Sequence, residues 1–210
     1  MKQFSFLLIL LAVMAMPGFS QNDSNDDPEI KTLFGDKPRT NGGYAGFGIG
    51  YTQLDGKDAV TTTFRGGWII NHGFVIGLSA TGFSNDFYVN HNPGTEYSSL
   101  QGGYGGLLFQ PIIFPEFPVH VSFPITLGAG GVAALHSHYY EAFDASYYLE
   151  DESFFLLAEP GVELELNIIK FIRASFGVSY RFTTPLNLID YQDDDMMGLT
   201  GSFTLSFGKF

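Results

Sequence analysis

One strand pattern repeats along most of this chain, and it constrains the fold more than any other feature of the sequence. Each copy has about ten residues in which apolar side chains alternate with small or polar ones, followed by a turn. In the last copy, residues 198–210, Leu199, Phe203 and Leu205 share one face and Thr200 lies on the other. Because successive strand side chains point to opposite faces, the apolar face must lie against an apolar medium, which we expect to be lipid.

Eight copies of the pattern are recognisable, and they predict a closed sheet. The expected strands are residues 42–54, 60–71, 74–84, 98–110, 119–136, 153–166, 171–182 and 198–210. A single-chain bacterial outer-membrane barrel has an even number of antiparallel strands. The sequence therefore predicts an all-β fold, an eight-stranded antiparallel up-and-down transmembrane β-barrel.

Two segments precede the expected barrel. Residues 1–20 have the features of a secretory signal peptide, with Lys2 at the positive end, an apolar run, and small Ser20 at the expected cleavage site. Residues 21–41 are polar and acidic, a composition that cannot bury a core, so we expect a flexible lead-in. The remaining residues, 42–210, are expected to form a single barrel domain.

Composition argues against several other classes of protein. The most apolar stretch after the signal, residues 121–135, is interrupted by Pro124 and by glycines, so it does not predict a membrane-spanning helix. A membrane protein of this kind must then be a closed barrel. The chain has no cysteine, so no disulfide stabilises it after export. Its net charge of -12 argues against nucleic acid as a partner, because phosphate binding needs a basic surface.

The connections between the expected strands fall into two alternating classes. Short connections are expected at residues 71–73, 115–118 and 167–170, and longer, mostly acidic ones at residues 55–59, 85–97, 137–152 and 183–197. Outer-membrane barrels have short periplasmic turns and longer extracellular loops. We therefore expect the long acidic connections to face outward from the cell.

A soluble lipocalin-like barrel is the structural alternative, since it also has eight up-and-down strands. Such a barrel would turn its aromatic side chains inward around a ligand and its charged side chains outward to water. The aromatic-rich apolar face and the alternation of short with long connections favour the membrane barrel instead.

The chain resembles the small eight-stranded outer-membrane barrels, the class of OmpX and the OmpA transmembrane domain. The resemblance rests on the export signal, the strand sequences FRGGWII and FTLSFGKF, the asymmetry of the loops and the terminal Phe210. It implies a Gram-negative outer membrane, outer-membrane lipids as surroundings, a monomer, and recognition of the C-terminal strand by the barrel-assembly machinery. Phe210 departs from the usual register, because it is opposite in phase to Phe203, Leu205 and Phe207.

Charged residues gather on the face that we expect to line the barrel interior. This expected charge network comprises Arg65, Glu159, Glu163, Glu165, Arg173 and Arg181. The hairpin through residues 167–170 should place Glu163 or Glu165 across from Arg173, within pairing distance. One interpretation is a gated network of salt bridges. The other is a filled lumen that stabilises the barrel, because eight strands enclose only enough room for side chains.

The expected third loop contains the other candidate sites. His136 and His138 share a face with Asp151 nearby, a weak candidate for a divalent metal site, and the His-Ser-His segment gives a weak hint of a lipid hydrolase. Four tyrosines of this loop are candidate contact residues or parts of a cross-strand ladder in a protruding hairpin: Tyr139, Tyr140, Tyr147 and Tyr148. The run of Asp193, Asp194 and Asp195 is expected to be solvated.

These observations favour a non-enzymatic surface barrel that contributes to envelope structure or contacts an external ligand through its loops. The sequence identifies no ligand, and it indicates no cofactor. Two alternatives remain open at this stage, namely a lipid-modifying enzyme at the outer leaflet and a narrow, gated channel for small solutes.

Overall fold

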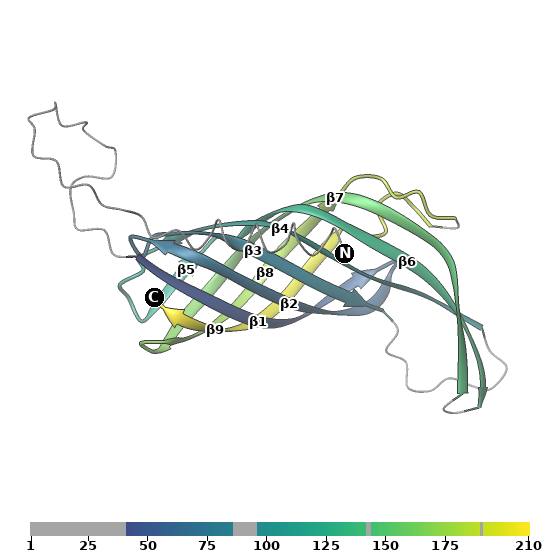
Figure 1. Ribbon diagram of the computed structural model, residues 1–210, viewed down its shortest axis with the longest axis horizontal. Coiled ribbons are helices and arrows are strands. Elements are labelled where there is room, and N and C mark those ends of the chain that lie inside the picture. The colour runs from purple at the N-terminus through teal and green to yellow at the C-terminus, as the bar shows by residue number, and fades with distance from the viewer. Residues whose placement is uncertain (1–40, 86–95, 142–143, 190) are drawn as a thin grey trace, which may run out of the picture. The chain divides into compact units, whose positions relative to one another are not determined.

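A computed structural model describes residues 41–85, 96–141, 144–189 and 191–210, which form a single antiparallel sheet that closes on itself (Figure 1). The strands are β1 (Asn41–Leu54), β2 (Lys57–Ile70), β3 (Phe74–Ser84), β4 (Glu96–Ile113), β5 (Val119–Ser122), β6 (Ile125–Glu141), β7 (Asp144–Ile169), β8 (Ile172–Thr183) and β9 (Gly198–Lys209). No helix in the described part of the chain is long and apolar enough to cross a membrane.

The ring has eight positions although the sheet has nine strands. β1 pairs with β2 and with β9, which closes the ring, while β5 and β6 both lie between β4 and β7 and so share one position. The prediction of an eight-stranded up-and-down barrel is confirmed. The prediction of one continuous strand over residues 119–136 is wrong, because the ladder is interrupted at Phe123 and Pro124. Proline has no amide hydrogen to donate to the ladder.

Several expected loops are shorter than the sequence pattern suggested. β6 and β7 continue their ladder to the pair Glu141 and Asp144, so the prediction of a loop over residues 137–152 is wrong and the protruding hairpin is confirmed. The connection predicted at residues 55–59 is a tight turn, in which Asp55 and Gly56 adopt φ angles of 51° and 66°. Apolar alternation fades where strands leave the lipid, which is why the pattern missed these extensions.

The barrel wall has an apolar outside and a closely packed inside. Large apolar side chains remain exposed on the outward face, among them Phe64, Trp68, Leu78, Phe176 and Leu199. The alternative with aromatics turned inward around a ligand is therefore wrong. The register of β4 places Leu100, Tyr104 and Leu108 inside. A Cβ at Gly106 would lie 2.2 Å from the Leu127 carbonyl oxygen, so this close approach of β4 to β6 requires glycine.

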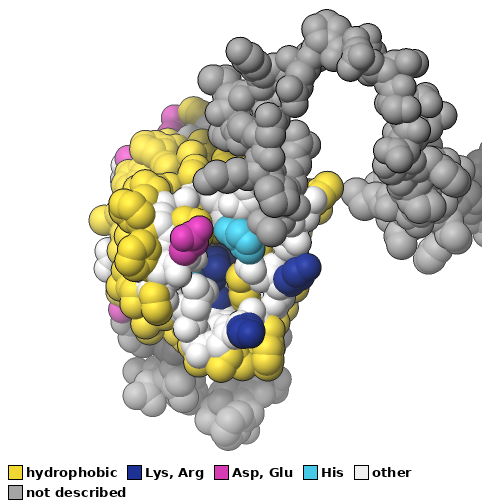
Figure 2. Space-filling view, turned by 90° about the vertical axis from the view of Figure 1, so that its left-hand side faces the viewer, with side chains coloured by type: hydrophobic (Ala, Val, Ile, Leu, Met, Phe, Trp, Pro, Cys, Tyr) yellow, Lys and Arg dark blue, Asp and Glu magenta, His cyan; other side chains and the backbone are white. Residues whose placement is uncertain are grey.

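The two ends of the barrel differ. The turn end contains the short connections after β2, β4 and β7, the start of β1 and the end of β9. The loop end contains the connections after β1, β3, β6 and β8. Figure 2 looks onto the turn end, where a hollow of about 690 Å³ is bordered by His72, Glu116, Lys170 and Lys209. Phe210 turns into this end, with its ring centroid 6.0 Å from that of Tyr44. Phe210 therefore points away from the lipid, unlike Phe203, Leu205 and Phe207, because its ring packs on Tyr44.

Candidate functional site

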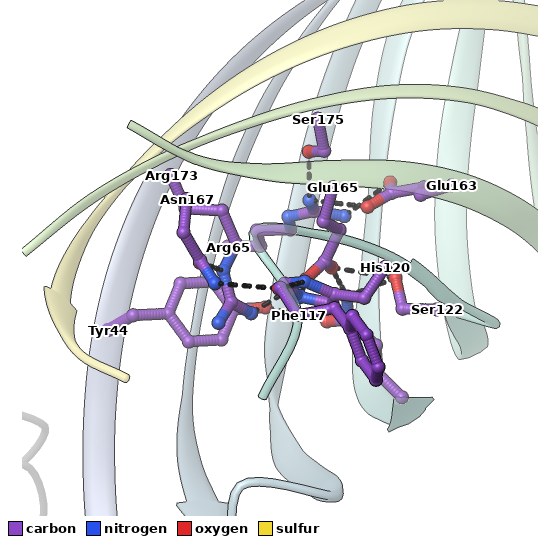
Figure 3. A network of polar contacts seen from close by, with 11 residues as sticks. Tyr44, Arg65, Phe117, His120, Ser122, Glu163, Glu165, Asn167, Arg173 and Ser175 are labelled. Atoms are coloured by element: carbon purple, nitrogen blue, oxygen red, sulfur yellow. Dashed lines mark hydrogen bonds and ion pairs between the residues drawn. The ribbon is translucent and has the colours of Figure 1, made fainter. Parts of the chain in front are cut away.

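A network of buried polar side chains fills the turn-end half of the barrel (Figure 3). One part of it is the ion pair between Arg65 of β2 and Glu163 of β7. Nη1 and Nη2 of Arg65 donate to the two carboxylate oxygens of Glu163 at 2.6 and 2.7 Å. Nη2 also donates to Ser175 Oγ at 3.1 Å. This paired geometry is the strong form of an arginine–carboxylate contact, and it joins opposite walls of the barrel.

Glu165 is the centre of the second part of the network. Its Oε2 accepts from Arg173 Nη1 at 2.6 Å and lies 2.8 Å from His120 Nε2. Its Oε1 accepts from Ser122 Oγ and from Gln110 Nε2, both at 2.6 Å. Four donors from β4, β5 and β8 thus converge on one carboxylate of β7, which is only 1% exposed. A carboxylate with this many donors is well satisfied in spite of its burial.

Residues at the edges of the network complete this layer. Arg173 Nε donates to Asn167 Oδ1 at 2.9 Å, and the Tyr44 hydroxyl donates to Gln110 Oε1 at 2.8 Å. His120 Nδ1 lies 3.1 Å from the carbonyl oxygen of Phe117. Both ring nitrogens of His120 therefore lie within hydrogen-bond distance of an oxygen atom. We call the ten polar side chains of this layer the turn-end network: Tyr44, Arg65, Gln110, His120, Ser122, Glu163, Glu165, Asn167, Arg173 and Ser175.

The turn-end network contains a serine, a histidine and a glutamate, but they are not arranged as a hydrolase triad. Ser122 Oγ donates to Glu165, and not to His120. A nucleophilic serine needs a base within hydrogen-bond reach, whose orientation is fixed by the acid. Here the carboxylate lies between the other two groups. This geometry suits a structural layer that blocks the lumen, and it gives Ser122 no activation.

A small cavity lies on the loop-end side of Arg65 and Glu163. Its volume is about 60 Å³, and its lining is rich in threonine and serine hydroxyls. A volume of this size holds about four water molecules. Glu159 borders the cavity, and its two carboxylate oxygens accept from the Tyr104 hydroxyl and from Ser179 Oγ, each at 2.8 Å. Glu159 is therefore satisfied without an arginine.

The loop-end half of the interior contains an apolar core, whereas the sequence predicted a polar interior. We call this apolar core the loop-end core. Strand residues supply its wall, including Leu54, Phe83, Leu100 and Phe155. Three further members come from residues 184–189 and 191–197, which we call the plug loop: Leu186, Leu188 and Met196. These three side chains are 8% exposed or less, so the plug loop folds into the barrel and closes it.

The plug loop is attached to the barrel by scattered hydrogen bonds. The amide nitrogens of Asn187 and Ile189 donate to Ser153 Oγ at 3.1 Å and to Asp151 Oδ2 at 3.0 Å. The hydroxyls of Tyr191 and Ser98 lie 2.8 Å apart. Most of these contacts use a side chain on one or both sides. The plug loop therefore lacks the continuous backbone ladder that holds the strands.

Arg181 lies against the loop-end core. Its side chain is fully buried, and Nε donates to the carbonyl oxygen of Met196 at 2.7 Å. Nη1 and Nη2 have no hydrogen-bond partner among the described residues. Of the six charged residues in the predicted network, the structure thus brings Arg65 and Glu163 together, and Glu165 and Arg173, but it places Glu159 and Arg181 in separate contacts.

The candidate residues of the predicted third loop lie in the β6–β7 hairpin. The ladder pairs His136 with Tyr148, His138 with Ser146, Ser137 with Tyr147, and Tyr139 with Ala145. The side chains of residues 136–148, Tyr140 included, lie outside the described part, so the metal and contact predictions for them stay predictions. Asp151 accepts from the Ile189 and Glu152 amides. Among the described residues, no three metal-ligating side chains are grouped to hold an ion.

Sequence reasoning missed two sets of interior residues. The first is the polar set formed by Tyr44, Gln110, His120 and Ser122. His120 and Ser122 alternate with Val119 and Val121, and this alternation is the signal that could have placed them inside. The second set is the apolar part of the plug loop. No strand period marks it, so its burial depends on tertiary contacts alone.

The fold is similar to solved outer-membrane barrels at low sequence identity. The sequence matches no family model and no curated protein. Neisserial surface protein A has a TM-score of 0.50 and 12% identity, over 83% of this chain and 100% of that chain. The attachment invasion locus protein Ail of Yersinia pestis has a TM-score of 0.44 and 15% identity, over 80% and 95%. The N-terminal barrel domain of Pseudomonas aeruginosa OprF has a TM-score of 0.41 and 8% identity, over 79% and 96%.

Proposed function

We propose that this chain is an outer-membrane barrel whose loop end faces outward from the cell, and that it binds an external protein segment along the β6–β7 hairpin. The observation that carries this proposal is the length of that hairpin. β7 has 26 residues, whereas its neighbour β8 has 12. The role is one of binding, and the buried polar residues serve the barrel's stability.

The apolar outer wall supports a position in a membrane. Large side chains such as Trp68, Leu107 and Phe176 are more than half exposed on every side of the ring. A soluble monomer rarely exposes an apolar patch larger than a few hundred Å². The strands also have the length that a membrane barrel needs, since about 9 to 11 tilted residues span the hydrocarbon layer.

Charge and loop length support the orientation. Short turns are typical of the periplasmic end of such barrels, and longer loops of the outer end. The turn end carries Lys170 and Lys209, whereas the loop end carries an excess of acid that includes Asp58, Asp151 and Glu152. The loop end therefore presents an acidic surface to the outside.

The hairpin offers a strand edge beyond the ring. The first pair between β7 and β8 is Leu157 with Thr183, whereas β7 pairs with β6 as far as Asp144. The plug loop lies along β7 at Asp151, Ser153 and Leu156, so the uncovered part is residues 144–149, roughly 20 Å at about 3.3 Å per residue. No strand lies on the β8 side of residues 144–149 in the described part of the chain. A free strand edge can take an extended peptide as an additional strand.

Charge beside this edge indicates the kind of partner. Asp151 and Glu152 lie on β7 next to exposed Leu149, and Asp193 and Asp194 lie on the neighbouring plug loop. An extended segment with alternating cationic and apolar side chains would complement them. A second copy of this acidic edge would be repelled, because like charges directly opposite one another on paired strands are destabilising.

The orientation can be tested on intact cells with single cysteines, since the chain has none of its own. Asp193→Cys at the loop end should react with a membrane-impermeant maleimide, and Glu116→Cys at the turn end should react only after the cells are opened. The reverse pattern of labelling would overturn the orientation.

Binding can be tested with the barrel in nanodiscs of zwitterionic lipid. A peptide of alternating Lys and Val should bind, and one of alternating Glu and Val should not. The double variant Asp151→Asn and Glu152→Gln should weaken binding, while Glu116→Gln at the turn end serves as the control. Equal binding of both peptides, or of neither, would contradict the proposed function.

A further inference from the structure

Arg181 is a buried cation with unused hydrogen-bonding capacity. Its side chain is 0% exposed, Nε donates to the Met196 carbonyl oxygen, and Nη1 and Nη2 make no hydrogen bond of good geometry with a described residue. Burying a guanidinium group is costly unless its donors find acceptors. An anion with two oxygen atoms would satisfy both Nη groups.

Two further unpartnered polar atoms lie near Arg181 on the inner wall. They are the hydroxyls of Thr183 and Thr200, and both side chains are less than 9% exposed. Thr183 follows Arg181 by two residues on β8, so both point inward, and Thr200 pairs with Ser179 on the same face. The unsatisfied donors thus belong to one region of the barrel wall.

The space above Arg181 is apolar and is filled by part of the chain itself. Met196, whose carbonyl oxygen accepts from Arg181, belongs to the loop-end core together with Leu186 and Leu188. The ring of Tyr104, another member of that core, lies 5.8 Å from the guanidinium carbon. The guanidinium group therefore lies against the loop-end core, to which the plug loop contributes three side chains.

Glu159 does not take the role of the missing anion. It lies on β7 beside β8, but its two carboxylate oxygens are engaged by Tyr104 and Ser179. The Nη groups of Arg181 stay unpartnered even with this carboxylate in the same layer of the barrel.

We propose that the loop-end core is a binding chamber for a free long-chain carboxylate, with the carboxylate on Arg181 and the acyl tail in place of the plug-loop side chains. Leu186, Leu188 and Met196 together present about as many side-chain atoms as the tail of dodecanoate has carbons. The exchange replaces one apolar occupant by another of similar size, so little apolar surface is exposed. It also supplies the two oxygen atoms that Arg181 lacks.

The attachment of the plug loop is consistent with such an exchange. Its amides of Asn187 and Ile189 donate to side chains of the wall, whereas the strands around it are held by continuous ladders. Segments with few backbone hydrogen bonds open at lower free energy than the strands beside them. The inference requires only the barrel and its interior, and it is independent of the partner proposed for the hairpin.

The direct test is binding of ¹³C-labelled dodecanoate to the barrel in nanodiscs of zwitterionic lipid, with empty nanodiscs as background. We expect saturable binding by the wild type, and a loss of about tenfold or more in affinity for Arg181→Gln. Lys57→Gln, which removes an exposed cation at the same end, should change nothing. Dodecanol and acetate, which lack the charge and the tail respectively, should both bind more weakly than dodecanoate.

Two variants keep the test decisive if Arg181→Gln folds poorly. Met196→Gly removes part of the present occupant and should raise the affinity for dodecanoate. The pair Ser153→Cys and Asn187→Cys should pin the plug loop when oxidised, since Ser153 Oγ lies 3.1 Å from the Asn187 amide. Binding should then be lost on oxidation and return on reduction.

Three results would overturn the inference. The first is no saturable binding by either the wild type or Met196→Gly. The second is equal binding of dodecanol, or of acetate, to that of dodecanoate. The third is binding that is indifferent to the disulfide between positions 153 and 187.

Discussion

The two halves of the barrel interior are closed by different means. At the turn end, charged side chains from β2, β7 and β8 pair with one another, and Glu165 accepts from four donors. At the loop end, an apolar core is completed by the plug loop, which no continuous ladder holds. The polar half stabilises the barrel, because each charge there depends on its partner. The apolar half can exchange the plug-loop side chains for another apolar group.

The largest effect is expected from a break in the polar half. Arg173→Ala would leave Glu165 buried with one fewer cation, and the loss of one partner of a buried pair costs about 3 to 5 kcal/mol. Lys57→Ala, which removes an exposed ion pair with Asp55, should cost about 0 to 1 kcal/mol. Urea unfolding in micelles measures both. Equal midpoints for the two variants would refute the assignment of Arg173 to a stabilising interior network.

A smaller effect is expected in the apolar half. Leu188→Ala removes a buried side chain of the plug loop and should cost about 2 kcal/mol, at the low end for such changes, because a loop can close part of the space. Protease cleavage within residues 184–197 should become faster while the strands stay intact. Leu199→Ala, on the lipid-facing side, is the matched control. Unchanged cleavage in Leu188→Ala would show that this segment does not open by itself.

Conductance should change only when both halves are opened. Eight strands enclose a space that side chains fill, and here the turn-end network and the plug loop each block it. Planar-bilayer recordings should show no steady current for the wild type, for the double variant Glu163→Ala and Arg173→Ala, or for a plug-loop deletion alone. Small openings should appear when the two changes are combined. A large, steady wild-type current would contradict the closed interior.

The smallest effect on stability is expected for the β6–β7 hairpin. Replacing its outer part, residues 139–147, by a short turn leaves every pair between β4 and β6 and between β7 and β8 in place. The free energy of unfolding should change by about 0.5 kcal/mol or less, as for other changes away from the core. A calorimetric scan checks this. A large loss of stability would show that the hairpin is part of the barrel's core.

The sequence predicted the wall of this barrel well, because strand alternation is a local signal. The outward positions of Phe64 and Trp68, and the inward positions of Arg65 and Glu163, follow from it directly. It failed at residues 123 and 124, where one proline interrupts a strand without changing its alternation. A proline of this kind removes a backbone hydrogen bond, but inward and outward side chains keep alternating past it. The alternation of apolar and polar residues therefore cannot detect the break.

The partners inside the barrel were harder to predict than the wall. Alternation places Arg181 inside but does not say which side chain it meets, since that depends on the ring's geometry and on Met196 of the plug loop. Likewise, Arg65 reaches Glu163 across the lumen, from a strand far away in sequence. Contacts across a lumen depend on how the sheet closes, so the alternation of residues along one strand cannot predict them.

Hydrogen exchange of backbone amides in nanodiscs tests the contrast between the two halves most directly. We predict that plug-loop amides such as Asn187 and Ile189 exchange through a local opening, at a rate that Arg173→Ala leaves unchanged. Amides of β5 and β7 around Glu165 should exchange only on global unfolding, and Arg173→Ala should speed them. Exchange of both regions at one common rate, shifted equally by that substitution, would contradict the account.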